Sequence, residues 1–199
     1  TSKVPVMMTL TFPNSDAAGQ VVSFSDERPN IVGMTREELQ NVVETLGMKP
    51  FVARQIWNWL HTKGALSFAA MRNVSKRNQE VLAQHLSIWT GGVDSDLCST
   101  DGTRKWLLRF DERTAVEAVY IPEPARGRGS MCLSSQCGCS LACSFCHTGT
   151  QKISRNLTAA EIVGQLLTAR RALGDAGRAR FHPRIRKPAP YQPYPIPAP

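Results

Sequence analysis

Apolar residues recur at helical spacing in three stretches of the chain between residues 35 and 87. The first stretch opens with a capping box, Thr35 followed three positions later by Glu38, and is closed by Gly47 and Pro50. Between these signals the pattern predicts one amphipathic helix. Its apolar face consists of Leu39, Val42, Val43 and Leu46.

Two further helices are predicted after it. One begins near Phe51 and ends at Lys63-Gly64, and the other begins after Ser75. Together the three predict a small helical module, which is either a structural bundle or a helix-hairpin-helix-like domain that touches nucleic acid backbones. The apolar stripes are Ala53, Ile56, Trp57 and Leu60 in the second helix and Val81, Leu82 and Leu86 in the third.

The period then changes from helical to alternating, which is typical of strands. In the stretch RKWLLRF, the apolar residues Trp106, Leu108 and Phe110 fall on one face, and the Asp-Gly pair at 101–102 is a hairpin signal. The stretch AVEAVYIP predicts a second strand that ends at Pro122.

Glu117 lies on this second strand, on the same face as Val119 and Ile121. A carboxylate beside two large apolar side chains is either on a solvated face of the sheet or held in a site. The pattern alone favours the solvated face, because carboxylates are seldom buried.

After a cysteine-rich stretch, RNLTAAEIVGQLLTARR repeats the helix-start pattern with Thr158 as the cap and Glu161 three positions later. Strand, cysteine loop and helix therefore follow one another, which is the order of the first half of a βαβ unit and predicts an α/β fold. From about Asp175 the pattern stops, and seven of the last nineteen residues are proline. We expect residues 176–199 to be disordered or polyproline-like.

Charge and composition change this picture only a little. The net charge is +8, but residues 171–199 hold six basic residues and one acidic residue, so the charge permits RNA as a partner without arguing for it strongly. No apolar run approaches the roughly 20 residues of a membrane helix, and residues 1–30 read as a loose leader without a secretory signal. We expect a cytoplasmic protein in a reducing compartment, with no membrane partner.

Five of the six cysteines fall between positions 132 and 146. A reducing compartment disfavours a disulfide framework. Cys139, Cys143 and Cys146 form the pattern C-x3-C-x2-C, with Phe145 before the last cysteine. Structural zinc sites use four protein ligands, whereas a four-iron cluster held by three thiolates leaves one iron open to bind a substrate or cofactor. Three ligands therefore favour an iron–sulfur cluster.

This cysteine pattern resembles that of the radical S-adenosylmethionine (SAM) superfamily. The stretches VEAVYIPE, CLSSQCGC, SFCHTGTQ and RNLTAAEIVGQ resemble, in order and spacing, the RlmN family of dual-specificity methyltransferases, which methylate C2 of adenine in 23S rRNA and tRNA. The resemblance spans roughly residues 30–175. It implies an N-terminal small helical accessory domain with short β-strands, followed by the start of a radical SAM partial (β/α) barrel.

The resemblance also implies roles for individual residues. Three cysteines match the ligands of a [4Fe-4S] cluster, whose open iron binds S-adenosylmethionine, and the aromatic residue before the last of them matches a cofactor-binding position. Glu117 matches a proposed general base that removes a proton from the modified adenine. Cys132 matches a cysteine implicated in resolving the protein–RNA intermediate. The expected cluster ligands are Cys139, Cys143 and Cys146, and the expected cofactor-binding residue is Phe145.

The family implies partners and a domain organisation as well. The expected partners are 23S rRNA and tRNA, with an external reductant such as flavodoxin, and the expected features include a monomeric state and a disulfide bond. The expected organisation is a leader over residues 1–30, a helical RNA-contacting accessory domain over 31–95, the beginning of the radical SAM core with the cluster loop over 96–175, and a Pro/Arg-rich tail over 176–199.

The chain departs from the family pattern after about Leu173. The family continues with further parallel strands, a Gly-Glu-Pro motif and a second reactive cysteine that accepts the methyl group, and the sequence has no counterpart of these. We therefore expect a truncated or frameshifted product that transfers no methyl group as it stands.

Two other functions are open at this point. One is the sister radical SAM enzyme that methylates C8 of adenine in rRNA. The other is a non-catalytic RNA-binding module stabilised by a metal, which predicts zinc in place of iron and RNA binding that weakens steeply as salt rises.

Overall fold

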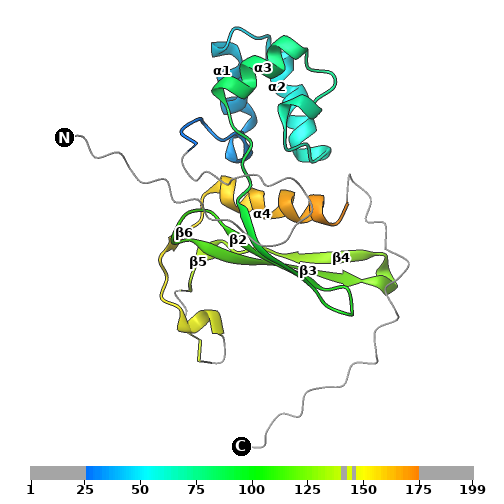
Figure 1. The fold of residues 1–199 in the computed structure, drawn as a ribbon, viewed down its shortest axis with the longest axis vertical. Coiled ribbons are helices and arrows are strands. Elements are labelled where there is room, and N and C mark those ends of the chain that lie inside the picture. Colours follow the sequence, from blue (N-terminus) through cyan, green and yellow to red (C-terminus); the bar gives the residue numbers. More distant parts are fainter. Residues whose placement is uncertain (1–25, 140–142, 145–146, 175–199) are drawn as a thin grey trace, which may run out of the picture.

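Helix α4 (Ala159–Ala172) lies between a layer of helices and a β-sheet (Figure 1). The structure is a computed structural model, and it describes residues 26–139, 143–144 and 147–174. The leader up to residue 25 and the proline-rich tail from residue 175 lie outside the described residues.

The helical layer contains the three predicted helices, α1 (Arg36–Thr45), α2 (Pro50–Trp57) and α3 (Lys76–His85). The predicted capping box is confirmed: the Thr35 amide donates to the Glu38 carboxylate at 2.7 Å, and the Glu38 amide donates to the Thr35 hydroxyl at 3.2 Å. Three short segments complete the layer: η1 (Ile31–Gly33), η2 (Asn58–Thr62) and η3 (Phe68–Ala70). No helix in the described ranges is both long and apolar enough to cross a membrane.

The apolar faces of these helices meet in one core. The predicted positions Leu39, Val43, Ile56 and Leu60 are at most 1% exposed. The π-helical segment η2 continues directly from α2, which is why the second predicted helix reaches its stop signal at Gly64. Burial of these side chains is what stabilises helices that are too short to persist alone.

The sheet has four strands in the order β1-β2-β3-β4, and every neighbouring pair is antiparallel. The pattern predicted β2 (Arg104–Arg109) and β3 (Ala115–Glu123), although β3 runs past Pro122, which pairs with Gly129. It missed β1 (Gly92–Cys98) and β4 (Arg128–Cys132). The short segments are η4 (Pro124–Arg126), η5 (His147–Thr150) and the paired strands β5 (Gln136–Cys137) and β6 (Arg155–Asn156).

The two faces of the sheet differ. Trp106, Leu108 and Ala118 are at most 1% exposed and belong to a second core together with Ala169 of α4. The opposite face carries Glu117 and the exposed side chain of Ile121. One face of the sheet is therefore covered by α4, and the predicted solvated position of Glu117 is confirmed.

The strand arrangement differs from the expected start of a barrel. A βαβ unit needs parallel strands, but each strand pair within the described residues is antiparallel. The chain is a mixed helix-and-sheet fold in which a meander leads to the cysteine loop and α4. The parallel barrel stays a prediction, because all of the described strands precede α4.

Helix α4 holds the two layers together. Leu167 is buried in the core of the helical layer, and Ala169 is buried in the core of the sheet. The helix approaches the connection between the layers so closely that a Cβ on Gly164 would lie 2.9 Å from the Thr90 carbonyl oxygen. The Thr168 and Thr90 hydroxyls are 3.0 Å apart and hydrogen-bonded.

An arginine of α4 makes a direct bond to the helical layer, and its removal tests this interface. Arg170 donates to the backbone carbonyls of His61 at 2.7 Å and Thr62 at 2.9 Å. We expect Arg170→Ala to lower the free energy of unfolding by about 1–3 kcal/mol, because two charge-assisted hydrogen bonds are lost. Urea denaturation followed by circular dichroism measures this loss.

The matched control is Arg171→Ala, which removes the same charge from an exposed position next along the helix. We expect this variant to change the free energy of unfolding by at most about 0.5 kcal/mol. Equal losses in both variants would contradict a specific role for Arg170.

Candidate functional site at the cysteine loop

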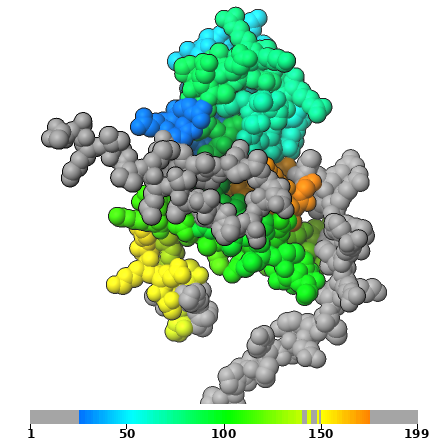
Figure 2. Space-filling model, in the orientation of Figure 1, coloured from blue at the N-terminus to red at the C-terminus, as the bar shows by residue number. Residues whose placement is uncertain are grey.

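The cysteine loop is closed at its base by backbone hydrogen bonds. The Cys139 amide donates to the Gln151 carbonyl at 3.2 Å, and the Ser154 amide donates to the Cys137 carbonyl at 2.8 Å. Strands β5 and β6 pair just outside this closure. The loop projects from the sheet on the side away from the helical layer (Figure 2). The two ends of the loop are therefore fixed by backbone hydrogen bonds.

Gly138 makes this closure possible. Its φ angle is +82°, a conformation that favours glycine. A Cβ at this position would lie 2.8 Å from the carbonyl carbon of Lys152 and 2.9 Å from the Cα of Ile153. Because backbone atoms cannot move aside as a flexible side chain can, the two arms of the loop require glycine beside Cys139.

The described part of the predicted ligand set lies on this loop. Cys139 and Cys143 are half-buried, whereas Cys146 and Phe145 lie outside the described residues. The described side chains form no group of three that could hold a metal ion. The sequence places all three cysteines within one closed loop, and a set of thiols suits iron and sulfide.

The expected disulfide is not found. Among the described cysteines no disulfide bond is formed, and Cys132 and Cys98 are exposed thiols. The base of the loop is held instead by backbone hydrogen bonds and by the close approach of its two arms at Gly138.

A buried glutamine positions the segment between β4 and β5, which leads into the loop. Gln165 of α4 is fully buried; its amide oxygen accepts from the Ser134 amide at 2.9 Å, and its nitrogen donates to the Ser134 carbonyl at 2.8 Å. Ser134 lies in the stretch CLSSQCGC between Cys132 and Cys139. The sequence did not point to Gln165, since a polar residue inside an amphipathic helix pattern gives no sign of a partner 31 residues away.

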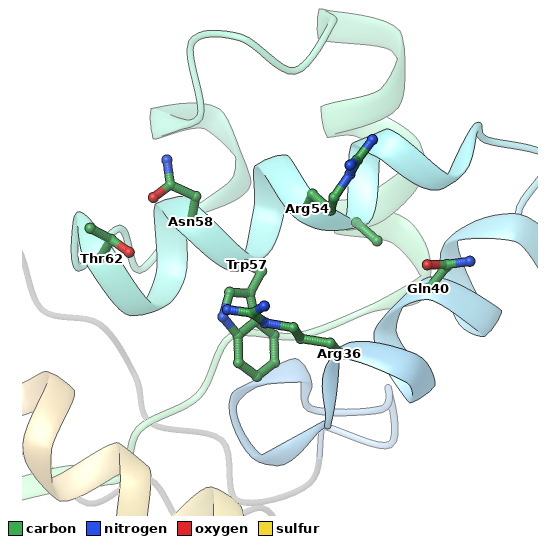
Figure 3. A pocket seen from close by; sticks show the side chains of 7 residues that line it. Arg36, Gln40, Arg54, Trp57, Asn58 and Thr62 are labelled. Atoms are coloured by element: carbon green, nitrogen blue, oxygen red, sulfur yellow. The ribbon is translucent and has the colours of Figure 1, made fainter.

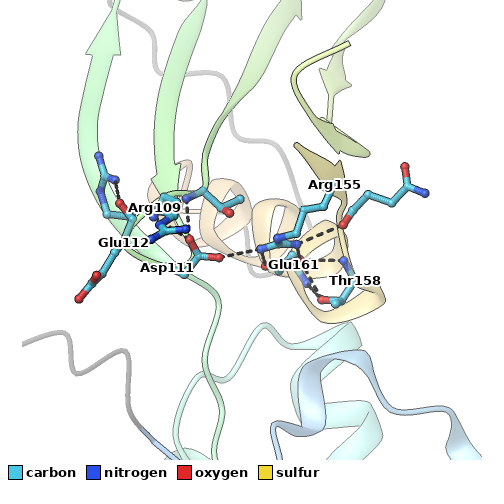
Figure 4. A network of polar contacts seen from close by, with 9 residues as sticks. Arg109, Asp111, Glu112, Arg155, Thr158 and Glu161 are labelled. Carbon is cyan, nitrogen blue, oxygen red and sulfur yellow. Dashed lines mark hydrogen bonds and ion pairs between the residues drawn. The ribbon is translucent and has the colours of Figure 1, made fainter. Parts of the chain in front are cut away.

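An ion-pair network anchors the other end of the loop (Figure 4). Arg155 of β6 lies 2.6 Å from the Glu161 carboxylate and 2.9 Å from the Asp111 carboxylate, which follows β2. The Glu161 carboxylate also accepts from the Thr158 amide at 2.7 Å, as the predicted capping box requires. Arg155 thereby joins the sheet, the base of the cysteine loop and the first turn of α4.

The network shifts the acid–base equilibria of its members. Burial alone would raise the pKa of Asp111, but hydrogen bonds from Arg155, Thr114 and Arg113 outweigh it and lower this pKa to about 2. Burial would likewise raise the pKa of Glu161, but hydrogen bonds from Arg155 and Thr158 outweigh it and lower this pKa too. The bonds to both carboxylates raise the pKa of Arg155. All three groups are therefore charged at neutral pH.

Glu117 and Cys132 project from the same open face of the sheet. Cys132 is the register partner of Val119, which lies two residues after Glu117, so the side chains of all three share a face. The Glu117 carboxylate lies 2.9 Å from the Lys105 ammonium. The Ser134 hydroxyl donates to the Glu117 carbonyl at 2.8 Å. The structure thus brings Glu117 and Cys132 onto one face, beside the segment at Ser134 that Gln165 holds.

The depressed pKa of Asp111 predicts acid sensitivity with a definite sign. Its folded pKa of about 2 lies below the ordinary value of 3.8, so its contribution to stability is complete above about pH 4 and is lost as the pH falls toward 2. Allowing for solvent screening of the half-exposed carboxylate, we expect Asp111→Asn to cost about 1 kcal/mol at pH 7 and almost nothing near pH 2.

Urea denaturation at several pH values measures this difference. Glu112→Gln is the control, because it removes a neighbouring carboxylate that forms no side-chain ion pair within the described residues. A difference between Asp111→Asn and the native chain that stays constant from pH 7 to pH 2 would contradict the assignment.

Comparison with known proteins shows which proteins the chain is similar to. Residues 29–88 match the family model described as the ribosomal RNA large subunit methyltransferase N-terminal domain. This match covers η1, α1, α2 and α3, that is, the helical layer that packs on α4.

Curated relatives extend the match beyond the helices. The dual-specificity RNA methyltransferase RlmN of Acidiphilium cryptum is 48% identical over 151 residues, which are 76% of this chain and 39% of the relative. The protein of the same name from Brucella melitensis is 49% identical over 159 residues, covering 75% of this chain and 38% of the relative. The chain thus spans about two fifths of the length of these curated relatives.

A solved structure agrees with these matches. A radical SAM methyltransferase from Sphaerobacter thermophilus has a TM-score of 0.67 and 33% sequence identity, covering 75% of this chain and 44% of the other. Together the family model, the curated relatives and this structure confirm that the chain is, over about three quarters of its length, a relative of the RlmN family of RNA methyltransferases.

Proposed function

We propose that this chain is the cluster-bearing and RNA-contacting part of a radical SAM methyltransferase that acts on C2 of adenine in 23S rRNA and tRNA. The observation that carries the proposal is the closed loop that bears the C-x3-C-x2-C pattern, in a chain related to RlmN proteins. In this proposal residues 31–95 are the RNA-contacting accessory domain and residues 96–175 begin the catalytic core. The proposed setting is the cytoplasm.

The proposed cluster ligands are Cys139, Cys143 and Cys146. Thiolates are the usual ligands of iron–sulfur clusters, and three of them leave one iron open for S-adenosylmethionine. When bound, this pair supplies the radical chemistry that the superfamily uses. Gly138 supports the assignment, because it lets the arms of the loop meet directly beside the first ligand. Phe145 is proposed to contact the bound cofactor.

Two further residues are proposed to act on the RNA. Glu117 accepts the proton that leaves the modified adenine, and its carboxylate is exposed on the open face of the sheet, 2.9 Å from the Lys105 ammonium. Cys132 supplies a thiol that resolves the intermediate. Their projection from one face of the sheet supports a joint role.

Gln165 acts through the backbone of Ser134. By bonding both the amide and the carbonyl of this residue, it fixes the segment that separates Cys132 from Cys139. It is therefore a proposed positioning residue, since its buried amide bonds only backbone groups within the described part of the chain.

The partners proposed for the whole enzyme are 23S rRNA and tRNA, with an external reductant such as flavodoxin, and the proposed state is a monomer. The relatives named dual-specificity RNA methyltransferase RlmN favour methylation of C2 over the sister reaction at C8.

Anaerobic reconstitution of the full chain with iron and sulfide tests the proposal. After reduction we expect an electron paramagnetic resonance signal of a four-iron cluster that shifts when S-adenosylmethionine is added, since the open iron would gain two ligand atoms. We expect Cys139→Ala to lose roughly 90% or more of this signal, because one of three thiolates is removed.

Cys98→Ala is the matched control. Cys98 is an exposed thiol at the end of β1, outside the cysteine loop, so its removal should leave the signal unchanged. Zinc in place of iron, or a cluster signal that does not respond to S-adenosylmethionine, would contradict the proposed chemistry and favour a metal-stabilised module.

A further inference from the structure

The helical layer contains a cleft of 370 Å³ beside α1 and α2 (Figure 3). This volume is within the range of pockets that hold small ligands. Its lining is basic and polar, with one aromatic ring and no carboxylate among the described residues that line it. The lining side chains that matter are Arg36, Gln40, Arg54, Trp57, Asn58 and Thr62.

The aromatic ring supports one of the arginines. The Arg36 guanidinium lies over the Trp57 ring, 5.2 Å from its centroid (Figure 3). The Trp57 ring also contacts the His61 ring, with centroids 4.1 Å apart. Stacking on an indole fixes the plane of a guanidinium while its N–H groups stay available as donors.

Within the described part of the chain, neither arginine of the cleft is paired with a carboxylate. Arg104, Arg109 and Arg155 each form an ion pair with a carboxylate, whereas Arg36 and Arg54 form none with the described residues. Arg36 is also the first residue of α1, where the helix dipole disfavours a positive charge. Two arginines therefore place positive charge around one cleft, and an anion bound there would also offset the unfavourable interaction of Arg36 with the helix dipole.

We propose that this cleft binds one unpaired nucleotide of the RNA substrate. The Arg54 guanidinium pairs with a phosphate, and the base stacks on the guanidinium plane of Arg36, which Trp57 supports from the other side. The groups that hydrogen-bond the base edge are the Asn58 amide and the remaining donor and acceptor of the Gln40 amide, whose nitrogen also donates to the Glu44 carboxylate at 2.9 Å. The proposal rests on the proposed function for the identity of the polymer, and adds the site and the kind of nucleotide.

The cleft lies far from the cysteine loop. The helical layer and the loop occupy opposite ends of the long axis of the molecule (Figure 1). Thr62 at the rim of the cleft is bonded through its carbonyl to Arg170 of α4. The cleft is therefore an anchoring site on the RNA, separate from the proposed reaction centre.

Binding of fluorescently labelled RNA to the full chain tests the proposal. The probes are a hairpin with a single-stranded loop and a duplex of the same stem. We expect the double variant Arg36→Ala, Arg54→Ala to weaken hairpin binding about tenfold or more, because it removes a phosphate contact and a stacked base. Arg54→Ala alone should reduce the slope of log K against log salt by about 0.7.

Arg36→Lys separates stacking from charge. This variant keeps the positive charge but loses the planar guanidinium on which the base stacks. We therefore expect weaker hairpin binding, with an unchanged dependence of binding on salt and unchanged duplex binding. It also keeps α1 capped by Thr35, so its folding is preserved. Native affinity of Arg36→Lys for the hairpin would overturn the nucleotide site.

The control is the double variant Arg72→Ala, Arg77→Ala, which removes the same charge from exposed positions of the helical layer. We expect less than about a threefold loss of hairpin binding, since surface charges away from a site contribute little. Equal losses in the two double variants would show a general basic surface and overturn the proposal. The cluster signal measured on the same samples separates the two ideas: its absence contradicts the proposed function, whereas the cleft is judged by RNA binding alone.

Discussion

Helix α4 is buried on two sides, and the rest of the structure depends on this double burial. Leu167 completes the core of the helical layer, and Ala169 completes the core of the sheet. Neither layer covers its own apolar surface alone, so each needs the helix to exclude water. The close approach of Gly164 to Thr90 and the bonds of Arg170 then set the distance and angle at which the two layers meet.

The same helix organises the cysteine loop from both of its ends. Gln165 holds Ser134 before the loop, and Glu161 holds Arg155 after it. These two residues of α4 are one helical turn apart, so they share a face of the helix. The loop is therefore positioned against a rigid element by hydrogen bonds and charge, while its own closure depends on backbone pairing.

Local signals in the sequence were sufficient for part of this fold. The capping boxes at Thr35 and Thr158 are short-range interactions, and both are present as predicted. Strands β1 and β4 were missed because most of their residues are exposed and apolar residues do not alternate strictly with polar ones along them. The bond between Gln165 and Ser134 depends on the packing of α4 on the sheet, which no short window of sequence contains. The candidate cysteines were readable from spacing, but the shared face of Glu117 and Cys132 depends on strand register.

Gly138 has a consequence for how this sequence can vary. Every substitution of a glycine adds at least a Cβ atom. At position 138 this atom would collide with the backbone of Lys152 and Ile153. The positive φ angle adds a second penalty of about 1 kcal/mol for residues with a side chain. The neighbouring Ser135 is exposed and Gln136 is half-buried, so these positions tolerate substitution. Among homologous genes, the base of the loop should therefore show one fixed position between variable ones, set by steric exclusion and independent of the chemistry of the thiols.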